Sequence, residues 1–326
     1  MGYTIGTPLL WTAFLFVILL LLMVDLGLFH RKAHAVSVKE ALVWSVVWVV
    51  LSITFGIWVY FHFGSQAGLE FFAGYLIEKA LSVDNVFVFI LIFSYFAVPS
   101  HLHHRVLFWG ILGALVMRAL FIIAGAALIS AFHWVLYLFG VFLVFTGFKI
   151  LREGETKVEP EKNPVVRLFQ RIVPMSSSYT SNGFFTREAG RIIATPLALV
   201  LVTVETTDLA FATDSIPAIF GVTRDPFIVY TSNVGAILGL RAMYFLLAAV
   251  IDRFVYLGKG LGIVLMFIGI KMLIAKYILI PIELSLAVVA AILVGAVAIS
   301  LIWPPKPPGN PSNPKPPLVT SVSIDN

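Results

Sequence analysis

Nine long apolar stretches follow one another along the chain, and short polar segments separate them. They lie at about residues 8–29, 40–62, 70–97, 105–128, 131–151, 191–220, 227–250, 254–276 and 283–303. A helix needs about 20 mostly apolar residues to cross the hydrocarbon core of a bilayer. The pattern therefore predicts an all-α fold, a polytopic membrane helix bundle with about nine transmembrane helices.

Composition supports this picture and narrows the chemistry. Of the 326 residues, 60% are hydrophobic and only 12% are charged, whereas about a quarter of a typical soluble chain is charged. Membrane lipid is therefore an expected partner. The chain has no cysteine, which excludes disulfides and thiolate metal sites. The formal net charge of +5 does not indicate nucleic acid, because the basic residues lie in connecting loops.

Lys and Arg gather in alternate loops. Arg31, Lys32 and Lys39 follow the first apolar stretch, and many more basic residues follow the fifth. Loops on the cytoplasmic side of a membrane carry an excess of these residues. The distribution predicts that the N-terminus lies outside and the C-terminus in the cytoplasm.

Two segments interrupt the apolar pattern. Residues 152–190 mix both charge signs and predict a cytoplasmic linker to which protein partners could bind. Residues 304–326 are rich in Pro, Gly, Asn and Ser, and this composition predicts a disordered tail. The other expected divisions are an N-terminal two-helix segment, a first and a second three-helix repeat, and a ninth helix, at residues 1–69, 70–151, 191–276 and 277–303.

An internal repeat recurs as three landmarks in the same order, one on each of three successive helices. The paired landmarks are Asp84 and Asp208, Arg118 and Arg241, and the segments 140–149 and 262–271. A unit of three helices reverses its direction across the membrane at each repetition. The repeat therefore predicts two inverted three-helix units, an architecture whose binding sites lie near the midplane in secondary transporters.

Acidic residues stand inside two of the predicted spans, where each costs roughly 2.5–3.5 kcal/mol to insert alone. The third span carries Glu78 and Asp84, and the sixth carries Glu205, Asp208 and Asp214. Such a set is retained where partners or a bound ion offset its cost. Carboxylate, amide and hydroxyl oxygens suit Mg²⁺, Ca²⁺ and Mn²⁺ rather than copper or zinc.

Helical spacing places some of these groups together. Glu205 and Asp208 stand three residues apart and share a helix face. Glu78 and Asn85 share another face, so Asn85 is a further candidate ligand. Asp214 points elsewhere on a regular helix, but a kink or an unwound stretch at Pro217 would turn it inward.

Internal ion pairing is the competing interpretation of the acids. Lys79, Arg118 and Arg241 are also intramembrane and are expected to be counter-charges or gates rather than ligands. Three cations against five acids leave a formal surplus of two negative charges, which a divalent cation would neutralise. Asp25, near the inner end of the first span, is either an entry acid or an interfacial anchor.

The segments 78–89 and 205–220 resemble the two signature segments of the TerC family, in particular those of its Alx-type bacterial members. The resemblance covers about residues 7–303. It implies a bacterial inner-membrane protein that exports manganese, with the acidic positions of the family at Glu78, Asp84, Glu205, Asp208 and Asp214. Some relatives are linked with tellurium resistance or with a redox role.

We therefore expect a secondary transporter that exports divalent cations, most of all Mn²⁺, with Ca²⁺ as the next candidate. No enzyme activity and no permanently bound cofactor are expected, and exchange for protons is a hypothesis. Two other interpretations stay open. One is a membrane scaffold without transport, and the other is a redox or tellurium-resistance factor.

Overall fold

The computed structural model describes residues 4–29, 38–153, 163–176, 179, 183–188, 191–248 and 256–302. Helices account for nearly all of these residues. The helices are α1 (Pro8–Phe29), α2 (Val38–Phe63), α3 (Ser65–Tyr95), α4 (Ser100–Ala131), α5 (Val135–Glu153), α6 (Pro164–Ile172), α7 (Pro196–Phe220), α8 (Pro226–Leu238), α9 (Leu240–Leu247), α10 (Leu257–Ile274) and α11 (Ile282–Ile302). Two short strands, β1 (Phe185–Glu188) and β2 (Arg191–Ala194), form an antiparallel hairpin.

The helices confirm a multi-pass, all-α membrane protein. Within the described ranges, six helices are long and apolar enough to cross a bilayer: α2, α4, α5, α7, α10 and α11. Two shorter apolar segments, Pro8–Val24 and Pro226–Leu238, accompany them. The larger number of nine spans stays a prediction.

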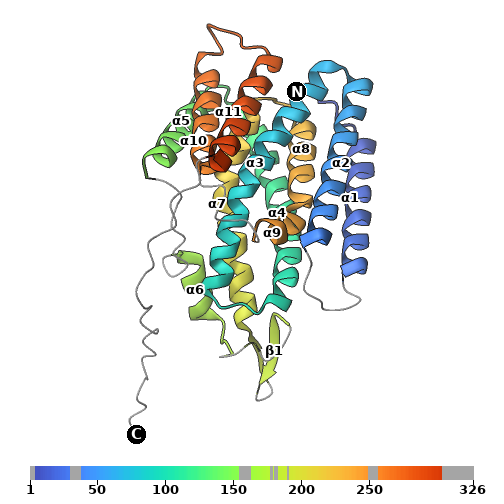
Figure 1. The fold of residues 1–326 in the computed structure, drawn as a ribbon, viewed down its shortest axis with the longest axis vertical. Helices are drawn as coiled ribbons and strands as arrows, with labels where there is room; N and C mark the ends of the chain where they lie inside the picture. The colour runs from blue at the N-terminus through green and yellow to red at the C-terminus, as the bar shows by residue number, and fades with distance from the viewer. Residues whose placement is uncertain are drawn as a thin grey trace.

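α3 and α4 are the longest helices of the bundle, and α3 lies in its middle (Figure 1). α3 contacts α2, α7, α8 and α11, while α4 packs along α7. α1 and α2 stand side by side at one edge, and α5, α10 and α11 gather at the other. α3 therefore lies at the centre of the bundle, where its polar residues meet those of its neighbours.

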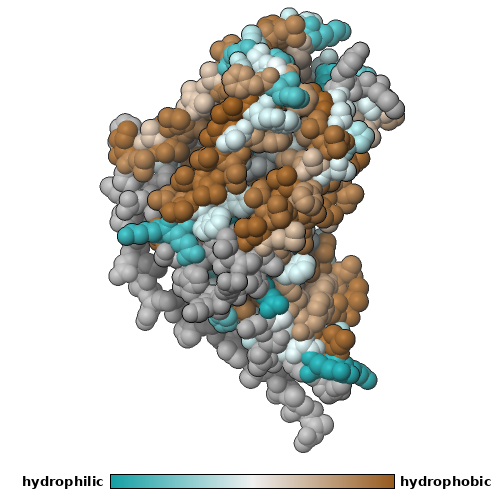
Figure 2. All heavy atoms as spheres, turned by 90° about the vertical axis from the view of Figure 1, so that its right-hand side faces the viewer, coloured by the Kyte–Doolittle hydropathy of each residue, from teal (hydrophilic) through white to brown (hydrophobic). Residues whose placement is uncertain are grey.

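The outside of the bundle is apolar. Figure 2 shows one face on which hydrophobic residues cover most of the described surface. Large apolar side chains are exposed on the outer helices, for example Phe16 on α1, Phe61 on α2 and Val294 on α11. Such a surface is stable in lipid rather than in water, which agrees with the apolar stretches of the sequence.

Glycines bring α5 and α10 into close contact. A Cβ atom added at Gly140 would lie 3.0 Å from the carbonyl oxygen of Gly269, and one added at Gly262 would lie 2.9 Å from that of Gly147. The earlier residue of one helix thus faces the later residue of the other, so the two helices run antiparallel. These glycines are the ones that correspond to each other in the internal repeat, and small residues of this kind allow close helix packing in membranes.

The structure corrects four details of the sequence-based prediction. The sixth span begins at Pro196 and not at residue 191, because residues 191–194 pair with β1. The seventh span, predicted at 227–250, breaks at Gly239 into α8 and α9. The linker 152–190 contains α6 and β1. α7 continues through Pro217 as a helix as far as Phe220.

Pro217 is tolerated because it stands three residues before the end of α7, so its missing N–H removes a single hydrogen bond near the helix terminus. The backbone N–H of Gly221 still donates to the carbonyl oxygen of Pro217 at 3.0 Å. The expected unwound stretch at Pro217 is therefore wrong, whereas a kink that turns Asp214 inward stays a prediction. The predicted tail 304–326 lies outside the described residues.

Candidate functional site

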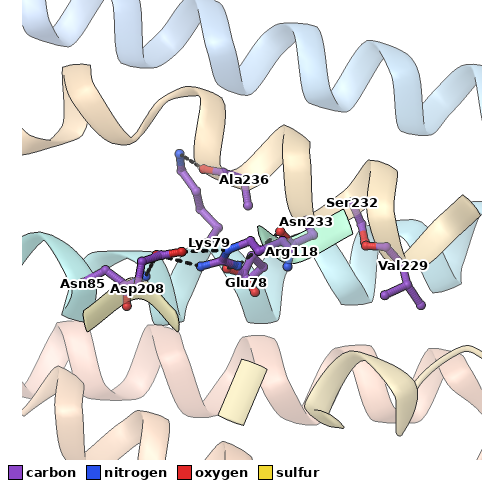
Figure 3. Close-up of polar contacts among 9 residues, drawn as sticks. All are labelled: Glu78, Lys79, Asn85, Arg118, Asp208, Val229, Ser232, Asn233 and Ala236. Atoms are coloured by element: carbon purple, nitrogen blue, oxygen red, sulfur yellow. Dashed lines mark hydrogen bonds and ion pairs between the residues drawn. The ribbon is translucent and has the colours of Figure 1, made fainter. Parts of the chain in front are cut away.

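A buried arginine on α4 joins two carboxylates from different helices. The Arg118 side chain is 1% exposed. Its Nη1 donates to Glu78 Oε1 on α3, while Nη2 donates to Asp208 Oδ1 on α7 at 3.1 Å and Nε donates to Oδ2 of the same carboxylate at 3.3 Å. Figure 3 shows the guanidinium between the two acids. The pairing with Asp208 is bidentate, the geometry in which arginine binds a carboxylate most specifically.

Two amides complete this network. Arg118 Nη1 donates to Asn233 Oδ1 on α8 at 3.1 Å, and Asn85 Nδ2 on α3 donates to Asp208 Oδ1 at 3.4 Å. All five side chains are buried. We call Glu78, Asn85, Arg118, Asp208 and Asn233 the charged cluster. It links four helices, α3, α4, α7 and α8.

Helical spacing explains why α3 supplies two members of the charged cluster. Glu78, Ser82 and Asn85 follow one another at intervals of four and three residues, and all three are buried. Lys79 is one position further round the helix. Its Nζ donates instead to the carbonyl oxygen of Ala236 on α8 at 3.2 Å. The predicted shared face of Glu78 and Asn85 is confirmed.

Close helix approach brings α8 within reach. A Cβ atom at Gly74 on α3 would lie 2.7 Å from Ser232 Oγ on α8. Ser232 precedes Asn233, the amide that contacts Arg118. Asp225 is the N-cap residue of α8, and its carboxylate accepts a hydrogen bond from the backbone N–H of Phe227 at 2.8 Å. The helix start is thus fixed by a side-chain cap, and this positions Asn233 against the guanidinium.

The other two acids of α7 lie outside the charged cluster. Glu205 is half-buried, and its carboxylate lies against Gly113 of α4, where an added Cβ atom would clash with it. Asp214 is also half-buried, and Thr146 Oγ1 on α5 donates to its Oδ1 at 3.4 Å. Asp214 stands six residues beyond Asp208, about 9 Å along the helix axis.

Two further predicted residues, Asp25 and Asp84, are placed only in part, whereas Arg241 is placed fully. Asp25 lies on α1 and Asp84 on α3, but both side chains lie outside the described part of the structure. Arg241 is buried on α9, two residues after the break at Gly239. The side chains of the two repeat-related arginines are therefore both inside the bundle.

The described residues contain no group of three or more His, Asp or Glu side chains close enough to hold a metal ion. The guanidinium lies between two of the five carboxylates that the sequence offered as ligands, Glu78 and Asp208, and this leaves the charged cluster with a formal charge of −1. The assignment of Glu78, Asp84, Asn85, Glu205, Asp208 and Asp214 as metal ligands stays a prediction.

Sequence reasoning missed two polar residues near the acids. Asn233 belongs to the charged cluster, and its position as a polar residue within an apolar helix was the available signal. Ser215 on α7 is buried and lies close enough to Glu78 to interact with its carboxyl group, although its hydroxyl is outside hydrogen-bond geometry. Among the described residues, Glu78 Oε2 and Ser82 Oγ also lack a hydrogen-bond partner. Oxygen atoms therefore remain available around Glu78.

Comparisons with known proteins agree with the resemblance noted in the sequence. The sequence pattern of the integral membrane protein TerC family matches residues 63–306. An uncharacterized membrane protein of Myxococcus xanthus, STKORF319, is 50% identical over 299 residues, which cover 92% of this chain and 94% of the relative. A protein of Escherichia coli strain K12 with the provisional name membrane-bound redox modulator Alx is 51% identical over 300 residues, which cover 89% and 94%.

A more distant relative, an uncharacterized membrane protein of Rickettsia bellii, is 39% identical over 292 residues, which cover 90% of this chain and 97% of the relative. No solved structure matches the chain. The family pattern covers well over half of the sequence and includes α3, α4, α7 and α8, the helices that hold the charged cluster. The chain belongs to the TerC family of integral membrane proteins.

Proposed function

We propose that this protein is a secondary transporter that exports divalent cations from the cytoplasm, with Mn²⁺ as the leading candidate. One observation carries the proposal: carboxylates from α3 and α7 meet inside a membrane protein, around one cationic side chain. Ionisable residues within membrane spans are costly, and they mark ion and substrate pathways in membrane proteins.

The available donor atoms suit the proposed cargo. Glu205 and Asp208 share one face of α7. The side-chain amide of Asn85 on α3 contacts Asp208, and the amide oxygen of Asn233 on α8 contacts Arg118. Hard oxygen donors bind Mn²⁺, Ca²⁺ and Mg²⁺. We assign the first contacts with the metal to Asp208 and Glu205, while Glu78 and Asn233 hold Arg118.

The order of acids along α7 describes a path. If the N-terminus lies outside, α7 starts on the cytoplasmic side, because it follows the linker. A cation from the cytoplasm then meets Glu205 first and Asp208 one turn later, about 4.5 Å further along the helix. Asp214 lies about 9 Å beyond Asp208, beside Thr146 on α5, so these contacts assign only Glu205 and Asp208 to the path.

The packing supports an alternating movement of two inverted units. Gly140 faces Gly269 and Gly147 faces Gly262, so the equivalent segments of the two units contact each other reciprocally. The break at Gly239 between α8 and α9 interrupts a helix beside the charged cluster. Inverted units and discontinuous helices are features of transporters that expose a central site to each side in turn.

Manganese flux into proteoliposomes tests this function. The wild-type chain should move Mn²⁺, and Asp208→Asn and Glu205→Gln should each lower the flux at least tenfold, since each removes a charged ligand. Glu283→Gln is the matched control, because Glu283 is an exposed acid in the first turn of α11. Equal flux in all four proteins would refute the proposed site.

Proton exchange and a redox role are resolved in the same preparation. Exchange for protons requires that a pH gradient accelerates manganese flux.

The provisional name of the E. coli relative suggests a redox role. The chain lacks cysteine, so thiol chemistry is excluded and a bound redox cofactor would be required. An absorption spectrum of purified protein that shows such a cofactor, together with absent metal flux, would favour the redox alternative.

A further inference from the structure

We propose that Arg118 is a tethered substitute for the transported cation: it neutralises the carboxylates of the empty transporter and releases Asp208 when the metal binds. This inference rests on the proposed function and describes how the same site returns to its starting state. Its physical basis is the placement of one buried guanidinium between Glu78 and Asp208.

The empty site holds a counter-charge without a metal ion. Arg118 contacts both Glu78 and Asp208, so its positive charge reduces the formal charge of this group from −2 to −1. A buried carboxylate without a compensating charge is strongly unfavourable in a medium of low dielectric constant. With Arg118 in place, the empty transporter can change its orientation without carrying another cation at these two acids.

The guanidinium is held unequally by its two carboxylates. Asp208 accepts its two bonds at 3.1 and 3.3 Å, longer than the 2.7–2.9 Å that is typical of strong charge-assisted bonds. Glu78 and Asn233 both accept from Nη1, so Arg118 keeps two partners if it leaves Asp208. Asp208 is therefore the carboxylate that a metal ion can bind in place of Arg118.

Glu205 supplies the second carboxylate for the incoming metal. It lies on the same face of α7, one turn before Asp208. Its side chain is half-buried, whereas that of Asp208 is buried. A divalent ion that contacts both acids compensates them itself, so the loaded transporter does not need Arg118 at Asp208. Only the return of the empty transporter depends on the guanidinium.

Two flux measurements separate these steps. Net export requires the return of the empty transporter, whereas exchange of labelled for unlabelled Mn²⁺ across the vesicle requires only the loaded form. We expect Arg118→Gln to lower net flux at least tenfold while exchange persists, and Arg118→Lys to retain net flux because the charge remains. A loss of fold would lower both fluxes equally, so this split is a readout that a purely structural role does not produce.

Several outcomes would overturn the proposal. Folded Arg118→Gln protein with unchanged net flux would show that another group, such as a proton, neutralises the empty site. Equal loss of net flux and exchange in folded protein would assign Arg118 to the loaded form. Wild-type protein without either flux refutes the proposed function itself, which distinguishes that failure from the failure of this inference.

A charge-balanced double variant keeps the test valid if Arg118→Gln does not fold. In Arg118→Gln with Glu78→Gln, the buried ion pair is removed together, and Asp208 is left without its guanidinium. We expect this double variant to keep exchange and to lose net flux at least tenfold, because only the return of the empty transporter needs Arg118. Net flux close to that of the wild type, or equal loss of both fluxes in folded protein, would refute the role of Arg118.

Discussion

The substitution Gly113→Ala tests whether the position of Glu205 matters for transport. Gly113 lies on α4 directly against the Glu205 carboxylate, and a Cβ atom at this position would overlap the carboxyl carbon and both of its oxygens. The change adds a single methyl group and removes no charge, no hydrogen bond and no proposed ligand. Its effect therefore reports on geometry alone.

The structure sets the size of the effect. Ordinary contact with a Cβ atom begins at 3.4 Å, so the carboxylate must retreat by about 1 Å or more to make room. A misplacement of about 1 Å at a reacting centre can lower a rate roughly a hundredfold. We expect a ten- to hundredfold fall in manganese flux, because the displaced Glu205 carboxylate is no longer positioned to bind the same ion as Asp208.

Stability should change little in the same variant. The clashing atoms are the far end of a flexible and half-buried side chain, so Glu205 can rotate away, and alanine is favoured over glycine in a helix by roughly 1 kcal/mol. The free energy of unfolding in detergent should therefore stay within about 1 kcal/mol of the wild-type value. Metal uptake is measured per amount of folded protein, and thermal unfolding measures the stability of each variant.

Gly110→Ala is the matched control for this experiment. Gly110 lies one turn earlier on α4, where an added Cβ atom would meet a methyl group of Val204 at 3.2 Å and no carboxylate. We expect this variant to keep its flux to within about twofold, because a small shift of an apolar contact leaves the acids in place. If Gly113→Ala also kept its flux, Glu205 would not be a positioned ligand and the proposed path would fail.

Three further predictions concern stability and are measured by thermal unfolding in detergent. Gly147→Ala should lower the free energy of unfolding by about 1–3 kcal/mol, because its added methyl group meets the backbone of α10. The control Gly295→Ala should not, because an added Cβ atom there has no atom within 4 Å. Equal melting temperatures of the two variants would contradict the packing of α5 against α10. Asp225→Ala should cost about 1–2 kcal/mol because it removes the cap of α8, and an unchanged melting temperature would exclude that role. Tyr244→Phe should cost about 1 kcal/mol because it removes the bond that Tyr244 donates to His103 Nδ1 at 3.0 Å; a more stable variant would argue against this contact.

The helices were predictable because lipid imposes a simple rule on sequence. Segments of about 20 apolar residues have few alternatives to a spanning helix, and the expected 8–29 coincides with α1. The ends were less predictable where the polar segments have structure of their own. Residues 191–194 join a hairpin because Thr186 and Ile193 pair across it, and local hydropathy carries no information about such pairing.

The charged cluster was predictable in its members but not in its connections. Helical spacing placed Glu78 and Asn85 on one face of α3, as the structure has them. Spacing cannot show which helices are neighbours, so the contact of Arg118 with both Glu78 and Asp208 required the tertiary arrangement. Asn233 was missed for the same reason, since α8 approaches α3 through small residues whose partners lie far away in the sequence.

Ion pairing and metal binding entered the sequence analysis as rival explanations of the same acids, but Arg118 makes them compatible. A buried ion pair is weak evidence for a stabilising role, because apolar residues of similar volume often stabilise a core as well or better. The charges that join three helices in this membrane protein therefore call for another reason. A guanidinium that pairs with both Glu78 and Asp208 in the empty site, and leaves one of them to a divalent cation, supplies that reason with the contacts that the structure contains.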